Sequence, residues 1–200
     1  QAYIALQRRF VADASHQLRT PLAVLKTQVA MARRDDDPQM RGEALAAIEG
    51  GVDGMGRLVN QLLTLARAEP GGAALRKEAL DFGEVARSAT ESLAGIAFAR
   101  AIDLSFDGAP EPLSVVGHVT LLRELVVNLV ENALRHIPRH GAVSVRLARE
   151  GGQVLLAVED NGPGIAAADR ERVFERFHRL APSTIEGTRL GLAIVKEIVA

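Results

Sequence analysis

The 200-residue sequence contains no cysteine and no tryptophan, and aromatic residues make up only 4% of it. The absence of cysteine excludes disulfide scaffolds, thiolate zinc sites, iron–sulfur clusters and cysteine nucleophiles. With so few aromatic residues, the hydrophobic core must be built from aliphatic side chains. Charged residues (24%) and hydrophobic residues (48%) are close to the averages of soluble globular domains, which argues against a disordered chain.

The chain also lacks an excess of charge of one sign, since its formal net charge is −1 at pH 7. No global basic field is available to recruit nucleic acid or anionic lipid, so we expect no nucleic-acid partner. No apolar run approaches the roughly 20 residues that a membrane-spanning helix needs. Residues 1–10 do not have the form of a signal peptide. We expect a soluble intracellular piece of a longer protein.

Apolar residues recur at steps of three or four in two segments, residues 10–32 and 45–66. This spacing is typical of long amphipathic helices, and in the second segment it averages about 3.5 residues, as in coiled coils. The acidic, proline-containing segment 35–38 between them predicts a short turn. The sequence therefore predicts an antiparallel helical hairpin over residues 1–69, which a second copy completes as a dimeric four-helix bundle.

The pattern changes after the second helix, where residues 70–75 are predicted to be a linker. Asp81 with Glu84 three residues later is a capping pattern, and it opens a helix that runs into the nineties. Strands are predicted at Ile102–Phe106, Leu113–Val116, Ala142–Leu147 and Val154–Glu159, and helices at Val119–Arg135 and Gly191–Ala200. Strands interleaved with helices predict a two-layer α/β sandwich over residues 76–200, with helices on one face of a mixed sheet.

One histidine of the first helix lies away from the apolar side. On a helical wheel His16 lies nearly opposite the apolar face, beside Thr20. Pro21 lies inside the helical pattern, where a missing backbone hydrogen bond costs about 3 kcal/mol. Imidazole has an unperturbed pKa of about 6.5, so it is largely neutral and nucleophilic at neutral pH. A solvated surface histidine is the plainer interpretation, and a nucleophile is the functional one.

Residues 10–22 read FVADASHQLRTPL, and they resemble the H box of bacterial two-component sensor histidine kinases. The resemblance is strongest to the subgroup that includes tricarboxylate-transport sensors. It implies that His16 is the phosphoacceptor and that residues 1–69 form the dimerisation and phosphotransfer hairpin. The implied partners are a second copy, through residues 1–69, and the receiver domain of a response regulator.

The same resemblance assigns catalytic roles to Gln17, Thr20 and Pro21. Gln17 stands where the family usually has glutamate or aspartate as the proposed proton acceptor. A carboxamide can orient the imidazole by a hydrogen bond but cannot serve as a general base. Thr20 matches the family position linked to positioning water for dephosphorylation of the regulator, which implies a possible phosphatase activity.

Two asparagines and an arginine line one face of the predicted helix 119–135. Asn128, Asn132 and Arg135 follow one another at spacings of four and three. A polar face toward solvent is the plainer interpretation. In the functional interpretation, amide oxygens of Asn132 and Asn128 ligate Mg²⁺, a hard cation that is commonly shared with substrate phosphates. Arg135 then faces the phosphates as a charge-assisted donor.

Asp160 follows directly on a predicted strand and is followed by Gly162 and Gly164. A plain turn is one interpretation. A carboxylate only accepts hydrogen bonds, so it also matches the exocyclic amine of adenine, and glycines let the backbone pass close to a flat base. Neither a Walker loop nor a dinucleotide fingerprint is present.

In order and type, the segments from Asn128 to Val195 resemble the N, G1, F and G2 boxes of the GHKL-type ATP-binding domain. The resemblance implies that residues 178–187 form the ATP lid, and that the N-terminus of the last helix holds phosphate. Arg189 stands where the family usually has glycine. The residues that the resemblance assigns to ATP are Asn128, Asn132, Arg135, His136, Asp160, Gly162, Gly164, Ile165, Phe177, Gly187, Thr188, Arg189, Leu190, Gly191 and Leu192.

Together the resemblances imply the cytoplasmic catalytic core of a sensor histidine kinase, anchored in the inner membrane through segments before Gln1. ATP with Mg²⁺ would phosphorylate His16, and the phosphoryl group would pass to an aspartate of the regulator. The family pattern also implies further strands beyond Ala200. Three alternatives stay open: a catalytically impaired kinase that serves as a dimeric phosphotransfer or docking scaffold, a GHKL-type ATPase, and a plain helical-hairpin interaction protein.

Overall fold

The computed structural model describes the backbone over four stretches of the chain, residues 2–34, 37–68, 77–175 and 190–199. Within these stretches it describes the side chains except those of residues 2–13, 16, 17 and 68. The predicted linker, residues 70–75, lies outside the described residues. The chain divides into two compact units, Gln1–Leu63 and Thr64–Ala200. Nowhere in the described stretches is a helix both long enough and apolar enough to cross a bilayer.

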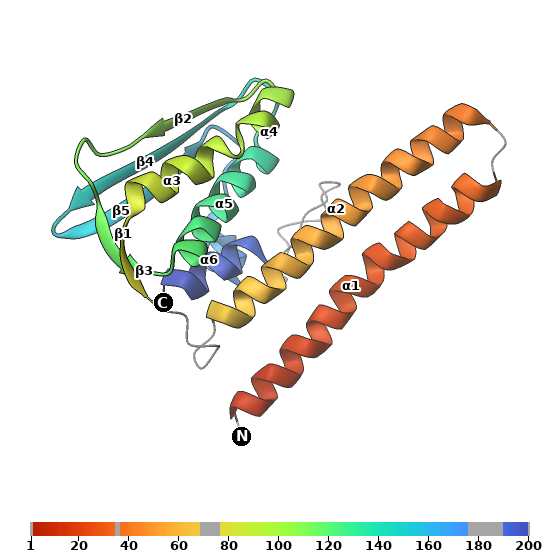
Figure 1. Cartoon of the computed structure of the whole chain (residues 1–200), viewed down its shortest axis with the longest axis horizontal. Helices are drawn as coiled ribbons and strands as arrows, with labels where there is room; N and C mark the ends of the chain where they lie inside the picture. The colour runs from red at the N-terminus through yellow and green to blue at the C-terminus, as the bar shows by residue number, and fades with distance from the viewer. Residues whose placement is uncertain (1, 35–36, 69–76, 176–189, 200) are drawn as a thin grey trace. The chain divides into compact units, whose positions relative to one another are not determined.

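The first unit contains the predicted antiparallel helical hairpin (Figure 1). α1 spans Ala2–Arg34 and α2 spans Pro38–Ala68. Asp37 precedes α2 and caps its start, because its Oδ1 accepts a hydrogen bond from the Gln39 N–H at 2.9 Å. Pro21 lies inside α1, as the sequence predicted.

α1 and α2 approach each other closely at Leu25 and Gly51. A Cβ added at Gly51 would lie 2.7 Å from Cδ2 of Leu25, so a larger residue fits only if the leucine moves. Other large apolar residues of the hairpin are exposed, among them Leu22, Val29, Leu45, Val52 and Val59. One chain therefore covers its own apolar seams only in part.

The second unit is a two-layer α/β sandwich (Figure 1). Its helices and strands are β1 (Glu78–Asp81), α3 (Phe82–Glu91), α4 (Ala94–Ala99), β2 (Asp103–Asp107), β3 (Ser114–Gly117), α5 (Val119–His136), β4 (Ala142–Glu150), β5 (Gln153–Asp160) and α6 (Gly191–Val199). Two short 3-10 helices, Ala167–Asp169 and Arg172–Phe174, lie between β5 and α6. β2 pairs with β4 in parallel and β4 pairs with β5 antiparallel, so this sheet is mixed. β1 and β3 form a separate antiparallel pair.

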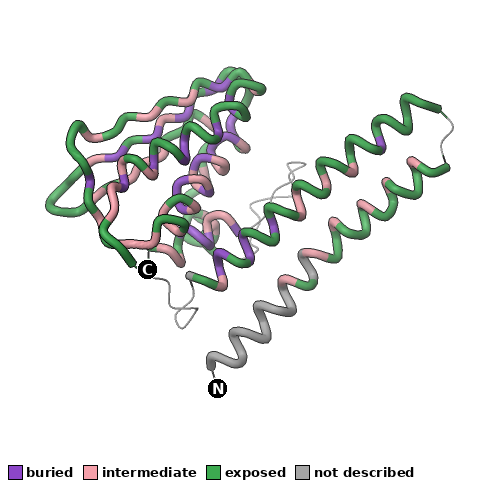
Figure 2. Tube along the Cα trace, viewed as in Figure 1, coloured by how far each residue is buried: buried purple, intermediate pink, exposed green. Residues whose placement is uncertain are grey.

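The core of this unit lies between the mixed sheet and the helices that cover one of its faces. On β4, Val143 and Val145 are buried while Arg146 beside them is exposed, as expected for a strand with one face toward the core. α5 contributes the buried apolar residues Leu125, Val126, Val130, Ala133 and Leu134. Figure 2 shows these buried stretches gathered along α5 and the sheet. The core is aliphatic except for Phe82 and the partly buried Phe106.

The predicted helix that Asp81 opens and that runs into the nineties is confirmed as α3, which ends at Glu91. A turn at Ser92 then separates it from α4, which was not predicted. The Ser92 hydroxyl donates to the Ala89 carbonyl, a local bond that competes with continuation of the helix. Asp81 caps α3 as predicted, since its Oδ1 accepts from the Gly83 N–H at 2.9 Å. Glu84 pairs with Arg87 instead of returning to the cap, so only half of the capping box forms.

Candidate functional site

α5 carries four of the predicted site residues: Asn128, Asn132, Arg135 and His136. Asn128 is only 3% exposed, and its Nδ2 donates to the backbone carbonyl of Glu124 at 2.8 Å. A face toward solvent is therefore the wrong interpretation for Asn128. Burial of an amide costs free energy unless the amide is hydrogen-bonded. The bond to Glu124 therefore favours one position of the Asn128 side chain.

The first residue of α6 lies directly against Asn128. A Cβ added at Gly191 would lie 3.1 Å from Oδ1 of Asn128, so the start of α6 approaches the middle of α5. Leu190 is buried, and Leu192 is half-buried. The predicted site residues Phe177, Gly187, Thr188 and Arg189, and the predicted lid over residues 178–187, lie outside the described residues.

β5 ends at Asp160, and the loop that follows passes the end of α5. The Gly162 N–H donates to Oδ1 of Asp160 at 2.8 Å, a local turn that leaves Oδ2 to accept from a group outside the loop. A Cβ at Gly162 would lie 3.6 Å from the carbonyl oxygen of His136 and 3.7 Å from Cα of Ile137. Glycine at this position therefore permits a close approach between the loop and α5.

Two further predicted residues continue this loop. Gly164 has a φ of +71°, in the left-handed region that favours glycine. Ile165 is half-buried, and its carbonyl accepts a hydrogen bond from Nε of Arg170 at 3.3 Å. Gly164 thus allows the loop a backbone conformation that other residues rarely adopt.

The end of α5 gathers charged groups around one imidazole. Burial lowers the pKa of His136, the positive charge of Arg135 lowers it further, and the Asp160 carboxylate opposes both. His136 is therefore largely neutral at pH 7. Arg135 also lies near Glu131, with Nη2 3.9 Å from Oε2. The structure brings Arg135, His136 and Asp160 together at one end of α5.

Sequence reasoning missed two residues of this region, Glu124 and Asn161. Burial raises the pKa of Glu124, Arg123 opposes this shift, and Glu131 adds to it. Asn161 accepts at Oδ1 a hydrogen bond from the Ala142 N–H at 2.9 Å, which ties the loop to the start of β4. The place of Asn161 directly after a strand, where asparagine favours turns, was the signal that could have found it.

The H-box residues lie in the first unit, in the middle of α1. His16 and Gln17 belong to this helix, but their side chains lie outside the description. Thr20 is exposed and Pro21 is half-buried. Because residues four apart share a helix face, Thr20 lies on the same side of α1 as His16.

A magnesium ion at this site would depend on amide oxygens. In the part of the chain that the structure describes, no three histidine, aspartate or glutamate side chains are grouped so as to hold a metal ion. Asn128 and Asn132 lie four residues apart on α5. Oxygen donors are what Mg²⁺ requires, and one or two protein ligands suffice where phosphates supply others, so these residues fit the ion.

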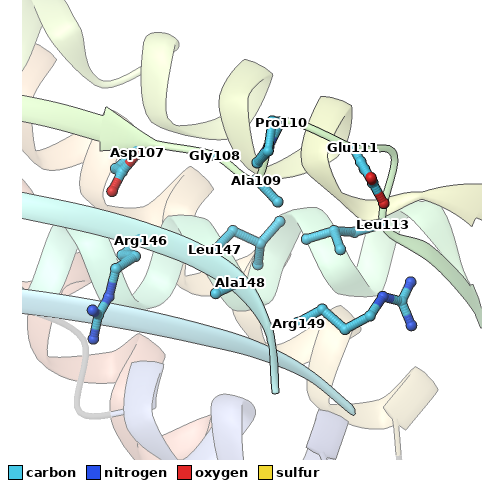
Figure 3. Close-up of a pocket in the computed structure, with 10 residues that line it drawn as sticks. All are labelled: Asp107, Gly108, Ala109, Pro110, Glu111, Leu113, Arg146, Leu147, Ala148 and Arg149. Carbon is cyan, nitrogen blue, oxygen red and sulfur yellow. The ribbon is translucent and has the colours of Figure 1, made fainter. Parts of the chain in front are cut away.

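A pocket of about 380 Å³ lies elsewhere in the second unit, between the β2–β3 connection and β4 (Figure 3). The charged side chains around it are Asp107, Glu111, Arg146 and Arg149. None of the predicted site residues lines this pocket. The α5 site and the pocket are therefore separate features of the fold.

Two family descriptions match the chain. Residues 6–71 match the His Kinase A (phospho-acceptor) domain. Residues 117–200 match the histidine kinase-, DNA gyrase B- and HSP90-like ATPase. The two matches cover the H box and the α5–Asp160–α6 region respectively.

Similar proteins agree with both matches. Sensor protein kinase PmrB of Pseudomonas aeruginosa is 37% identical over 194 residues, covering 96% of this chain and 40% of PmrB. The chain spans between 38% and 50% of the length of curated relatives such as PmrB, SphS and MprB. The solved structure of the mycobacterial sensor histidine kinase MprB is 35% identical with a TM-score of 0.53, covering 62% of this chain and 78% of that one.

The fold of the whole chain also has a solved counterpart. The histidine kinase ThkA, solved in complex with the response regulator protein TrrA, gives a TM-score of 0.74 at 21% identity, covering 98% of this chain and 55% of that one. This likeness concerns the arrangement of a helical hairpin followed by an α/β domain. With the two matched domains and the identity to MprB, it follows that this chain belongs to the sensor histidine kinase family.

Proposed function

We propose that this chain is the catalytic core of a sensor histidine kinase, in which ATP bound by the second unit phosphorylates His16. The observation that carries the proposal is the approach of two sequence-distant segments, the start of α6 and the Asp160 loop, to α5. Gly191 approaches Asn128, and Gly162 approaches the carbonyl of His136. The domain division proposed with it is 1–69 for the phosphotransfer hairpin, 70–75 for a linker and 76–200 for the ATP-binding domain.

The residues around α5 suit a nucleotide with its magnesium ion. Oδ2 of Asp160 would accept from the adenine amine, and Arg135 would donate to phosphate. Amide oxygens of Asn128 and Asn132 would hold Mg²⁺, which supplies charge neutralisation to the phosphates when bound. The remaining ATP-binding residues carried over from the family pattern complete the proposed contacts, including Phe177 and residues 187–189.

In the transfer step, an unprotonated ring nitrogen of His16 attacks the γ-phosphorus of ATP. A nitrogen–phosphorus bond forms while the bond to the β–γ bridging oxygen breaks, and ADP leaves. The other ring N–H can be held by the Gln17 amide, which orients the ring without removing a proton. Pro21, about one turn further along the continuous helix α1, is proposed to serve local bending beside the reactive side chain.

Dimerisation and transfer to a response regulator complete the proposal. Apolar residues of α1 and α2 that are exposed in one chain, such as Leu22 and Val52, support a four-helix bundle with a second copy. The ThkA–TrrA complex supports a regulator as the partner that accepts the phosphoryl group on an aspartate. Thr20, exposed on the His16 side of α1, supports a phosphatase activity toward that regulator.

The finer assignments rest on the sequence motif and on the family. The reading His-Gln-Leu-Arg-Thr-Pro-Leu from His16 supports the tricarboxylate-transport sensor subgroup. Relatives named as sensor proteins support a location as the cytoplasmic portion of an inner-membrane protein, anchored by segments N-terminal to this chain. A catalytically impaired docking scaffold is the second candidate, and Gln17 and Arg189 favour it because each replaces a residue type usual in the family.

The test is incorporation of γ-labelled phosphate from ATP into the wild-type chain, His16→Ala and Arg189→Gly. Acid-labile label that disappears in His16→Ala would support the kinase and show that Gln17 and Arg189 are tolerated. Label that appears only in Arg189→Gly would favour a kinase disabled at one position. No label in any folded, dimeric variant would contradict autophosphorylation, and ATP turnover that survives His16→Ala would favour a GHKL-type ATPase.

A further inference from the structure

Arg100 connects α4 to the last turn of α5. Its Nη1 donates to the carbonyl of Leu134, and its Nη2 donates to the carbonyl of Ile137 at 2.8 Å. Arg100 is thus the donor to two carbonyls that lie more than thirty residues further along the chain. Arginine suits this position because its planar guanidinium presents several donors in a fixed arrangement.

The turn that ends α4 sets the direction in which the Arg100 side chain extends. The Ile102 N–H donates to the Ala97 carbonyl and the Ala101 N–H donates to the Phe98 carbonyl, both at 2.9 Å. Ala101 has a φ of +52°, so α4 closes in a Schellman motif with Arg100 as its C-cap residue. The hydrogen bonds of this turn therefore hold the Arg100 backbone in place, and the side chain extends from it to the end of α5.

The carbonyls that Arg100 reaches belong to a helix end that needs donors. The last carbonyls of an α-helix have no partner within the helix. Leu134 and Ile137 are each only 1% exposed, so water has little access to them. A guanidinium at this end also places positive charge at the negative end of the helix dipole.

The same turn carries the residues proposed to meet the nucleotide. Arg135 and His136 lie between the two carbonyls, and the loop at Gly162 passes within contact distance of His136 and Ile137. A Cβ at Gly141 would lie 2.3 Å from Cδ1 of Ile137, so the start of β4 also packs on this turn. A continuous set of contacts thus runs from Arg100 to the Asp160 loop.

We propose that Arg100 is a positioning residue of the nucleotide site, acting through the last turn of α5. It holds that turn so that Arg135, His136 and the Asp160 loop keep one relative arrangement. This inference rests on the proposed ATP-binding function. Without the guanidinium, two buried carbonyls lose their donors and the turn can fray, so nucleotide affinity falls although no contact to the nucleotide is removed.

The experiment compares the whole chain with Arg100→Met, Arg100→Lys and, as control, Arg87→Met. Methionine keeps an apolar stem without donors, and lysine keeps the charge with fewer donors in a different geometry. Arg87 lies on α3 and pairs with Glu84 at the surface, so its replacement removes an arginine without touching α5. Two readouts are used: the Kd for ADP with Mg²⁺, and amide hydrogen exchange at Ile137 and Gly162.

Arg100→Met is expected to bind ADP about tenfold more weakly, within the range typical of coupling between separate sites, while Arg87→Met binds as the wild type does. Exchange at Ile137 and Gly162 should be faster in Arg100→Met, and Arg100→Lys should recover part of both effects. In autophosphorylation the KM for ATP should rise while the rate at saturating ATP is kept.

Unchanged ADP affinity and unchanged exchange in folded Arg100→Met would overturn the proposal, as would equal losses in Arg87→Met. Should Arg100→Met not fold, Arg100→Lys decides in the same way. A wild-type chain that binds no nucleotide would contradict the proposed function, and the exchange data alone would then decide. Faster exchange at Gly162 in Arg100→Met would still support the positioning role, and unchanged exchange would overturn it.

Discussion

Gly162 donates its backbone N–H to Oδ1 of Asp160 at 2.8 Å, and that oxygen lies only 2.6 Å from where an alanine would place its Cβ at Gly162. The bond that fixes the carboxylate is therefore possible only with glycine, unless Asp160 turns away. The carbonyl oxygen of His136 and Cα of Ile137 lie 3.6 and 3.7 Å from the same Cβ position. Position 162 therefore has no room for a side chain unless its neighbours shift.

Gly162→Ala is expected to displace the Asp160 carboxylate and to weaken nucleotide binding. Hydrogen bonds to charged groups contribute about 1.5–3 kcal/mol, so the Kd for ADP should rise roughly 10- to 100-fold. Titration calorimetry with ADP and Mg²⁺ measures this. Gly95→Ala, at a glycine with no atom near its Cβ position, is the matched control and should bind as the wild type does. Equal affinities for all three proteins would contradict the assignment of Asp160.

The lowered pKa of His136 predicts a distinct pH dependence. Its causes are burial, then Arg135, with Asp160 opposing. Arg135→Gln should therefore raise the pKa of the imidazole, and Asp160→Asn should lower it further. Titration of the His136 ring protons by NMR measures both shifts, and shifts of the opposite sign would contradict the described arrangement.

The same shift has a consequence for stability. Because the folded-state pKa lies below the unfolded value of about 6.5, the unfolded chain binds more protons in the window between them. Stability from this group is complete above about pH 6.5 and is lost as the pH falls through the folded-state pKa. His136→Gln should weaken the pH dependence of the urea unfolding midpoint over this window. An unchanged pH dependence would mean that other groups dominate it.

The long amphipathic segments of this protein were predictable because their periods extend over many residues. The helix at Val119–Arg135 and the strand at Ala142–Leu147 were predicted close to their observed bounds. β1 was not predicted, because four residues with a half-buried end carry too little alternation to stand out. α4 was not predicted either, because a helix of six residues carries too little periodicity to stand out.

The residues of the candidate site also differ in how far the sequence predicts them. Asp160 and Gly162 were predicted from chemistry that their residue types allow, and the glycine was expected to make room for a flat base. The structure adds a second reason, the close approach to the end of α5. The bonds of Arg100 and Asn161 could not be predicted, because they join segments whose proximity depends on the tertiary fold.

α5 begins without a side-chain cap, and this predicts a stabilising substitution. His118 is the N-cap residue, its side chain makes no capping bond, and among the described residues its buried Nδ1 has no hydrogen-bond partner. His118→Asp would supply an acceptor for the first helical N–H groups and negative charge at the positive helix end. We expect a gain of about 1 kcal/mol in the free energy of unfolding at pH 7.

Urea unfolding of the whole chain measures this gain. His140→Asp makes the same change of residue type at an exposed position outside any helix, so it should leave the midpoint near that of the wild type. The gain of His118→Asp should disappear below about pH 4, where the new carboxyl is protonated. A midpoint no higher than that of His140→Asp would mean that the N-cap is already satisfied in solution.

Two adjacent glycines in α2 provide a test of the hairpin packing. Gly50 has no atom within 4 Å of its Cβ position, whereas the Cβ position of Gly51 lies 2.7 Å from Cδ2 of Leu25. Alanine is favoured over glycine within helices by about 0.8–1 kcal/mol, so Gly50→Ala should stabilise the chain by about that amount. Gly51→Ala has the same intrinsic gain, but the leucine must move, and overpacking of this kind costs about 1–3 kcal/mol.

A double-mutant cycle separates these two effects at Gly51. In a Leu25→Ala background the obstructing methyl groups are absent, so Gly51→Ala should there recover the gain seen for Gly50→Ala. Gly50→Ala should show the same gain in both backgrounds, because its Cβ meets no side chain of α1. Thermal unfolding followed by helical circular dichroism measures all the variants at one protein concentration, since dimerisation would make the midpoint depend on it. Equal gains for both glycines in the wild-type background would mean that α1 and α2 do not pack through Leu25 and Gly51.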